Sequence, residues 1–111
     1  MKPRKGGLAC VSSFVKEQRE QYGDGVVLMD NGDILQGQPI AYYYNYIDTT
    51  SVHVTSAMLN YMKYDVGTMG NHDVETGHAV YDRWVKQCAF PVLGAILWTI
   101  KRENLILLPI K

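Results

Sequence analysis

The sequence lacks an excess of charge of either sign, because 11 Lys and Arg residues are balanced by 11 Asp and Glu residues. A balanced charge gives no general attraction to a nucleic acid polymer or to an anionic membrane surface, although a local site can still bind phosphate. The chain also lacks an apolar run long enough to span a membrane. We therefore expect neither a nucleic acid polymer as partner nor a membrane span.

Cysteine is scarce as well. Cys10 and Cys88 lie far apart and show no CxxC spacing, which favours two reduced thiols over a disulfide. No apolar segment follows the basic N-terminus, so no signal peptide can be read from the sequence and the compartment stays unknown. With 111 residues and 47% apolar content, the chain has the size of one small domain with a core of its own.

What the chain does have is a regular alternation of predicted elements. Apolar spacing predicts helices at 8–20, 52–62 and 77–87 and short buried strands at 26–29, 64–67 and 90–93, and Gly23 or Gly25 is expected to end the first helix. An aromatic-rich segment at 41–46 fits neither period clearly. Alternation of this kind predicts an α/β fold with a mostly parallel sheet and crossover helices. In such sheets the ligand-binding loops follow the carboxyl ends of the strands.

Two glycine-containing turns occupy such positions. Asp30-Asn31-Gly32-Asp33 follows the first predicted strand, and Gly70-Asn71-His72-Asp73 follows the second, at the start of a loop expected over 68–76. Either turn alone is most often a structural turn without a function, and a single Asp after a strand is most often a helix cap. Together they offer carboxylate, amide and imidazole groups at one edge of the sheet.

These side chains suit metal-assisted phosphoester chemistry. The Asp33 carboxylate can bridge two divalent ions, and Asn71 offers a neutral amide oxygen as a further ligand. His72 can donate to a phosphoryl oxygen or to a leaving group. A carboxylate can orient its ring, and the candidates are Glu75, three residues on, and Asp73.

Other polar and aromatic residues have simpler interpretations. His53 lies on a predicted helix surface and His78 near a helix start, so both are interpreted as solvated or capping residues. Asp48 to Ser51 provide candidate N-caps for the helix at 52–62. The tyrosines at 42, 43, 44 and 46 are expected to pack in the core and loops rather than to stack on bases.

At this point the motifs resemble a known family. Gly32-Asp33, followed after a helix and a strand by Gly70-Asn71-His72-Asp73, resembles the second and third motifs of the calcineurin-like metallophosphoesterases. The segments 32–37 and 90–95, with Gly6-Gly7-Leu8-Ala9 about one helix earlier, are similar to the 5′-nucleotidase and 2′,3′-cyclic-nucleotide phosphodiesterase branch. The resemblance covers roughly residues 6–95.

The resemblance implies part of the family's α/β/β/α sandwich and a set of residue roles. Asp33 would be the carboxylate shared by two divalent ions, and Asn71 a ligand of the second ion. His72 would be the catalytic histidine, contacting the substrate phosphate together with Asn71. Glu75 stands where nucleotidases of this branch often have the Asp that orients this histidine. The metals could be Mn, Zn, Mg, Fe or Co, which these ligands do not separate. The family attacks phosphorus with a metal-bound hydroxide.

Some of the family's pattern does not occur in this sequence. The chain starts after the expected place of the Asp-x-His motif and ends before the downstream His and Gly-His-x-His motifs and the substrate-binding domain. Of the usual ligands only Asp33 and Asn71 are present, and two ligands do not define a tight two-metal site. We therefore expect the isolated chain to be catalytically dead or nearly so.

Residues 96–111 fit this scheme poorly, since they show no clear period and a dense apolar finish. One interpretation is a plain strand or a frayed tail. The other hypothesis is a reading-frame slip, because restoring one adenine after the codon for Ala95 permits a polar, Gly- and Pro-containing continuation typical of the family. We therefore divide the chain into a partial metallophosphoesterase domain at 1–95 and an atypical tail at 96–111. The encoding DNA decides between the two hypotheses.

The sequence thus favours part of a metal-dependent phosphoesterase that hydrolyses nucleotide phosphomonoesters or cyclic phosphodiesters, so the expected partner is a nucleotide or another small phosphoester. Two alternatives stay open. One is a non-catalytic binding module that keeps the scaffold and a weak ion site, and the other is a truncated product without a function of its own. Relatives in this branch are often periplasmic or exported, but no segment of this sequence reports on export.

Overall fold

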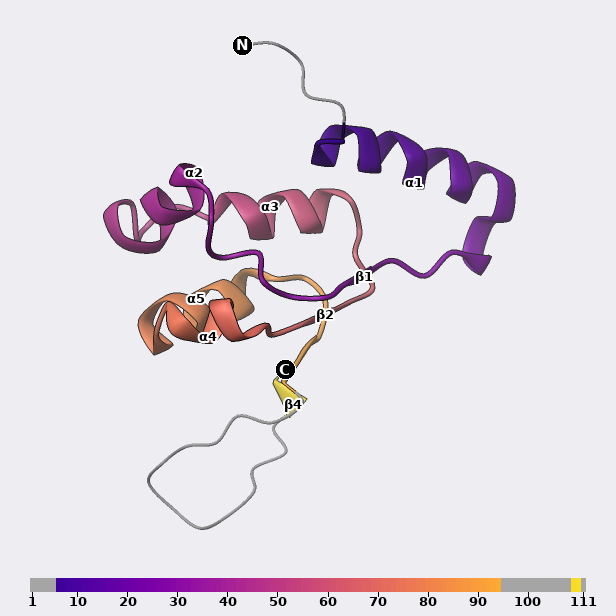
Figure 1. Cartoon of the computed structure of the whole chain (residues 1–111). Coiled ribbons are helices and arrows are strands. Elements are labelled where there is room, and N and C mark those ends of the chain that lie inside the picture. Colours follow the sequence, from indigo (N-terminus) through magenta and orange to yellow (C-terminus); the bar gives the residue numbers. More distant parts are fainter. Residues whose placement is uncertain (1–5, 95–108, 111) are drawn as a thin grey trace.

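The computed structural model describes residues 6–94 and 109–110, in which helices and strands alternate as predicted (Figure 1). The helical elements are α1 (Leu8–Tyr22), η1 (Gly23–Gly25), α2 (Pro39–Tyr42), η2 (Tyr43–Ile47), α3 (Val54–Tyr61), α4 (Asn71–Glu75) and α5 (His78–Gln87). The strands are β1 (Met29–Asp30), β2 (Val66–Thr68), β3 (Val92–Leu93) and β4 (Pro109–Ile110). The predicted domain boundary at residue 95 and most of the 96–111 tail lie outside the described residues.

The strands form one sheet in the order β1-β2-β3-β4. β1, β2 and β3 are parallel, as the alternation of elements predicts, whereas β4 runs antiparallel to β3. Helices α2, η2 and α3 connect β1 to β2, and α4 and α5 connect β2 to β3. Because β1 and β2 are parallel, the segments that follow them leave the sheet at the same edge. This topology brings the two predicted turns together.

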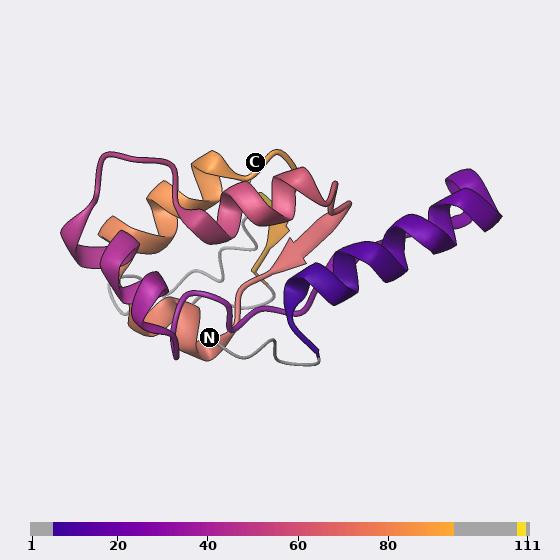
Figure 2. The same ribbon diagram turned by 90° about the horizontal axis from the view of Figure 1, so that it is seen from above.

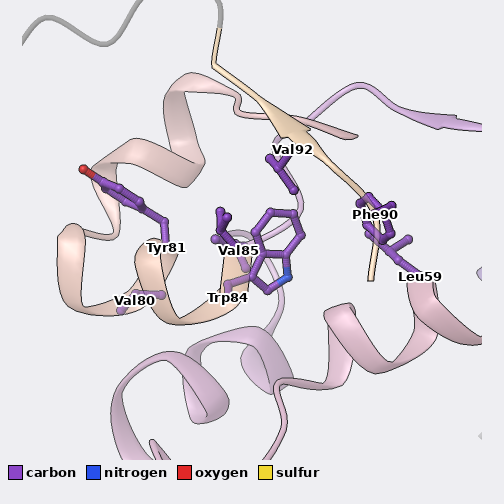
Figure 3. Close-up of a cluster of buried hydrophobic side chains, with 8 residues drawn as sticks. Leu59, Val80, Tyr81, Trp84, Val85, Phe90 and Val92 are labelled. Carbon is purple, nitrogen blue, oxygen red and sulfur yellow. The ribbon is translucent and has the colours of Figure 1, made fainter. Parts of the chain in front are cut away.

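The core lies where α3 and α5 pack toward the sheet (Figure 3). Trp84 is fully buried there, among side chains of α3, β3 and the loop after β1. The buried positions of α5 recur one turn apart, which is why the periodicity of 77–87 predicted this helix. The cluster comprises Leu35, Leu59, Val80, Tyr81, Trp84, Val85, Phe90 and Val92.

The first strand differs from its prediction. A buried strand was expected over 26–29, but β1 has only two residues, and Val27 and Met29 are 68% and 67% exposed. Within the described residues β1 pairs with β2 alone, and α1 extends away from the sheet instead of covering it (Figure 2). An apolar run therefore predicted the strand but not which surface covers it.

Arg19 connects helix α1 to the end of α3. Its guanidinium donates to the carbonyl oxygens of Met62 and Lys63, each at 2.7 Å, at the C-terminal end of α3. A cation at this end of a helix satisfies free carbonyls and complements the helix dipole. The helix ends at Gly23 with φ 54°, one of the two glycines predicted to stop it.

Two further predictions can be compared with the described residues. Cys10 and Cys88 are both free thiols, as their spacing predicted, and burial raises the pKa of Cys88 to about 12. In the part of the chain that the structure describes, no helix is both long and apolar enough to cross a membrane.

The segment before α3 corrects two interpretations. The aromatic-rich stretch that fitted neither period is helical, but Tyr42, Tyr43 and Tyr46 are 45–60% exposed and do not enter the core. His53 caps α3, in place of the residues at 48–51, because its Nδ1 accepts from the Thr55 N–H at 3.2 Å. It is only 1% exposed, so the capping alternative for His53 is confirmed, whereas its expected position on the helix surface was wrong.

His53 makes the stability depend on pH. Burial, aided by the charge of Arg83, lowers the pKa of His53 from 6.5 to about 4. Below about pH 6.5 the His53 ring of the unfolded chain is protonated, whereas in the folded chain it stays neutral down to about pH 4. Stability therefore falls as the pH drops from about 6.5 to about 4. Between pH 7.5 and pH 5 we expect His53 alone to remove about 2 kcal/mol of unfolding free energy.

Urea unfolding of the wild type and of a His53→Gln variant at both pH values measures this effect. The other titrating groups are common to the two proteins, so their difference in stability isolates His53. We expect that difference to shrink by about 2 kcal/mol at pH 5, since the variant has no imidazole to protonate. A difference that stays constant with pH would contradict a neutral, buried His53.

Candidate functional site

The two predicted turns meet at a pair of glycines. A Cβ on Gly32, whose φ is +85°, would lie 2.5 Å from the Gly70 nitrogen. A Cβ on Gly70 would overlap the Asp33 carboxylate. Side chains at either position would push the segments apart, so glycine is required for this close backbone approach. The glycines of both motifs therefore serve to bring Asp33 next to the start of α4.

Asp73 fastens the two segments together. It is fully buried and accepts four backbone N–H groups, from Asp33 (2.7 Å), Ile34 (2.9 Å), Leu35 (2.8 Å) and Gly70 (2.9 Å). A carboxylate that accepts several backbone donors stabilises a loop strongly, because each bond is charge-assisted. Asp73 was one of two candidates for orienting His72, and that interpretation was wrong because both of its oxygens face the backbone.

The second turn is partly helical, which the sequence analysis did not predict. A loop was expected over 68–76, but Asn71–Glu75 form a short helix. Gly70 is its N-cap, and the Asp73 carboxylate in the first turn accepts the Gly70 N–H, as in one half of a capping box. An acidic residue three positions after a possible N-cap was the sequence signal for this helix. That residue is Asp73, whose structural role the sequence analysis missed.

Asp33 lies directly against α4. It adopts φ 60°, a left-handed conformation that is uncommon for residues other than glycine and that here turns its carboxylate toward α4. Its Oδ1 accepts the backbone N–H of His72 at 3.0 Å. The carboxylate is exposed, so it stays accessible to a ligand from solvent. Asn71, the first residue of α4, is exposed at the same end of the helix.

His72 pairs with Glu75. The distance from His72 Nδ1 to Glu75 Oε2 is 3.0 Å, and the two side chains are 52% and 54% exposed. The hydrogen bond that His72 donates to Glu75 and the negative charge of Glu75 raise the pKa of His72, with smaller contributions from the charges of Asp33 and Asp73. Because a carboxylate only accepts hydrogen bonds, this contact places a proton on Nδ1 and leaves Nε2 available to a ligand.

Replacement of Glu75 tests this pairing. Glu75→Gln removes the charge and the acceptor that favour the imidazolium, so we expect the pKa of His72 to fall toward its ordinary value. An NMR titration of the His72 ring protons measures the shift. Glu20→Gln, an exposed glutamate on α1, is the matched control and should leave the His72 titration unchanged. Equal titrations in the Glu75 variant and the wild type would contradict the pairing.

Asp30 was part of the first motif but received no role from the sequence. Its Oδ2 is buried without a hydrogen-bond partner among the described residues. Burial raises the pKa of Asp30, partly opposed by the hydrogen bond from the Gly32 N–H. His78 is as exposed as predicted, at 73%, and lies 3.5 Å from Asp82 on the surface of α5. Neither residue joins the group formed by Asp33, Asn71, His72 and Glu75.

The donor set fits part of a metal site. Asp33 and Asn71 provide a carboxylate and an amide oxygen, which suit a hard divalent cation. Within residues 6–94 and 109–110, no group of three or more His, Cys, Asp or Glu side chains is arranged to hold an ion. The described residues therefore offer one edge of a site rather than a closed coordination sphere.

Comparisons with known proteins agree with this arrangement. No protein-family model matches the sequence. Among solved structures, the chain is similar to the calcineurin-like phosphoesterase YfkN from Bacillus subtilis, with a TM-score of 0.79 and 33% identity. That similarity covers 94% of this chain and 33% of the YfkN chain.

Curated relatives give the same result. The chain is 35% identical over 104 residues to the trifunctional nucleotide phosphoesterase YfkN of Bacillus subtilis, covering 88% of this chain. It is 35% identical over 94 residues to the 2′,3′-cyclic-nucleotide 2′-phosphodiesterase/3′-nucleotidase of Haemophilus influenzae, covering 82% of this chain. It spans 7% and 14% of the lengths of these two relatives.

The parallel sheet, the paired turns and these similarities define the class. The chain belongs to the calcineurin-like phosphoesterases. Its relatives place it in the 5′-nucleotidase and 2′,3′-cyclic-nucleotide phosphodiesterase branch, which confirms the resemblance read from the two motifs.

Proposed function

We propose that this chain supplies part of the active site of a metal-dependent phosphoesterase that hydrolyses nucleotide phosphomonoesters or cyclic phosphodiesters. One observation supports this above the others. The Asp33 carboxylate and the His72–Glu75 pair lie together at the carboxyl ends of parallel strands, joined by the hydrogen bond from the His72 N–H to Asp33 Oδ1 at 3.0 Å. The names of the relatives, which are nucleotide phosphoesterases, support the substrate class.

In this proposal Asp33 and Asn71 are ligands of the divalent ions that the family implies. Bound ions of this kind lower the pKa of water and neutralise charge on a transferred phosphoryl group. Asp33 is held in place for this role by its own N–H, which donates to Asp73, and by the His72 N–H on its carboxylate. Its orientation is therefore set before any ion binds.

His72 acts on the substrate side, where Asn71 joins it in contacting the phosphate. Because Glu75 raises the pKa of His72, the imidazole retains a proton nearer to neutral pH than a free histidine would. A proton held at Nε2 can be donated to a phosphoryl oxygen or to the leaving group. Glu75 is the orienting residue, since its carboxylate accepts the Nδ1 proton at 3.0 Å and leaves Nε2 for the substrate.

The isolated chain is expected to have little or no turnover. Asp33 and Asn71 are two ligands, and a catalytic two-metal site needs several more. We therefore propose that this chain binds a divalent ion weakly through these two residues and that efficient hydrolysis needs ligands beyond them.

A titration with Mn²⁺ tests the proposal. We expect Mn²⁺ to broaden the NMR signals of Asp33, Asn71 and His72 selectively, and Asp33→Ala to abolish the effect. Asp24→Ala, an exposed aspartate in η1, is the control and should leave the broadening unchanged. Broadening that persists without Asp33 would refute the ligand assignment. Hydrolysis of a chromogenic phosphodiester by the Mn²⁺-loaded chain, abolished by Asp33→Ala, would refute the expected inactivity.

A further inference from the structure

A buried chain of hydrogen bonds connects α5 to the loop that carries Asp33. Trp84 Nε1 donates to Thr55 Oγ1 at 2.9 Å, and Thr55 Oγ1 lies 2.9 Å from His53 Nδ1. His53 Nε2 lies 2.8 Å from Asn45 Oδ1, and Asn45 Nδ2 donates to the Leu35 carbonyl oxygen at 2.7 Å. All five residues are at most 7% exposed.

The direction of these bonds is fixed by their partners. His53 Nδ1 accepts from the Thr55 N–H, so the proton of the neutral ring is on Nε2 and is donated to Asn45 Oδ1. This orients the Asn45 amide with its nitrogen toward the Leu35 carbonyl. Each of these groups has its partner inside the protein, and a satisfied buried network of this kind favours one conformation.

Leu35 is where the network meets the candidate site. Its carbonyl oxygen is held by Asn45, while its N–H donates to Asp73 Oδ1 at 2.8 Å. Asp73 also holds the backbone N–H groups of Asp33 and Gly70. The segment from Asp33 to Leu35 is therefore clamped from both sides, by Asp73 on one and by Asn45 on the other.

We propose that Asn45 and His53 are positioning residues that hold the Asp33 carboxylate in its ion-binding orientation through the Leu35 carbonyl oxygen. The proposal rests on the role of Asp33 as a metal ligand. Residues outside the coordination sphere that orient a ligand change metal affinity about 10- to 100-fold when they are removed. Asn45 touches no candidate ligand directly, so its effect passes through the backbone of the loop.

A pair of asparagine variants provides a sharp test. Asn45→Leu removes the bonds to His53 and Leu35. Asn60→Leu is the matched control, because Asn60 also makes two bonds, donating to the Gln87 carbonyl and accepting the Ala89 N–H, both at 2.8 Å. Its bonds join α3 to the segment before β3 and do not reach the loop.

Hydrogen exchange and Mn²⁺ titration are the measurements. We expect Asn45→Leu to speed exchange at the amides of residues 33–35 and to weaken Mn²⁺ binding about tenfold. Asn60→Leu should destabilise the fold to a similar degree without selective exchange at this loop and with Mn²⁺ affinity changed less than about twofold. In the wild type, a ¹⁵N spectrum should show a slowly exchanging His53 Nε2–H, and His53→Gln should reproduce the faster loop exchange.

Three results would overturn the proposal. One is equal loop exchange and equal Mn²⁺ affinity in the two asparagine variants, which would make the network an ordinary part of the core. Another is a His53 ring proton that exchanges freely with water. The third is a His53→Gln variant with wild-type loop exchange. If Asp33→Ala leaves Mn²⁺ binding unchanged, the ligand assignment fails instead, and the exchange rates still decide whether Asn45 holds the loop.

Discussion

Asp73→Asn is expected to cost about 3–5 kcal/mol of unfolding free energy, because it removes the charge that strengthens four hydrogen bonds from backbone N–H groups and leaves two of those groups without an acceptor. Asp73 Oδ2 accepts the N–H groups of Asp33 and Gly70, and Oδ1 accepts those of Ile34 and Leu35. An asparagine must place an NH₂ group against one of these pairs of donors. Two N–H groups then lose their acceptor and face another donor.

Urea unfolding measures this cost, and Asp65→Asn is the control. Asp65 also accepts a backbone N–H from a distant segment, that of Leu28 at 2.7 Å, but it is exposed and accepts only this bond among the described residues. We expect the control to lose less than about 1 kcal/mol, since water can replace the lost acceptor. Similar losses in the two variants would show that Asp73 does not clamp the loop.

The sheet and most helices could be predicted because their signals are local. The period of α5 and the glycine that ends α1 follow from spacing alone, and parallel pairing follows from alternation. The meeting of Asp33 with the start of α4 followed as well, because parallel strands place their carboxyl ends at one edge. These inferences needed the order of elements rather than their packing.

What the sequence did not reveal depends on contacts between distant segments. Asp73 is a conspicuous acid beside a histidine, and only the approach of the loop after β1 turns it into a structural acceptor. His53 looked like a surface residue because its partner Asn45 lies in a segment without a clear period. The exposure of β1 could not be predicted either, because an apolar run does not show which element, if any, packs over it.

Gly32→Ala is expected to cost about 3–4 kcal/mol, the second largest effect. The new Cβ would lie 2.5 Å from the Gly70 nitrogen, 3.0 Å from its Cα and 3.1 Å from the Met69 carbonyl carbon. All three are backbone atoms, which cannot move aside as a flexible side chain would. A residue with a side chain is also strained at φ +85°. The two segments must separate, and the bond from the His72 N–H to Asp33 is lost with them.

Gly37→Ala separates the clash from the backbone strain. Gly37 has φ +104°, also in the left-handed range, but a Cβ there would meet nothing within 4 Å. It should lose only the conformational term, about 1 kcal/mol. Urea unfolding gives both values, and the NMR signal of the His72 amide reports on its bond to Asp33. If the two alanine variants lose the same stability and keep that signal unchanged, the close approach of Gly32 to Gly70 is not what places Asp33 beside His72. If only Gly32→Ala shifts the His72 amide signal, the close contact between Gly32 and Gly70 is what places Asp33 beside His72.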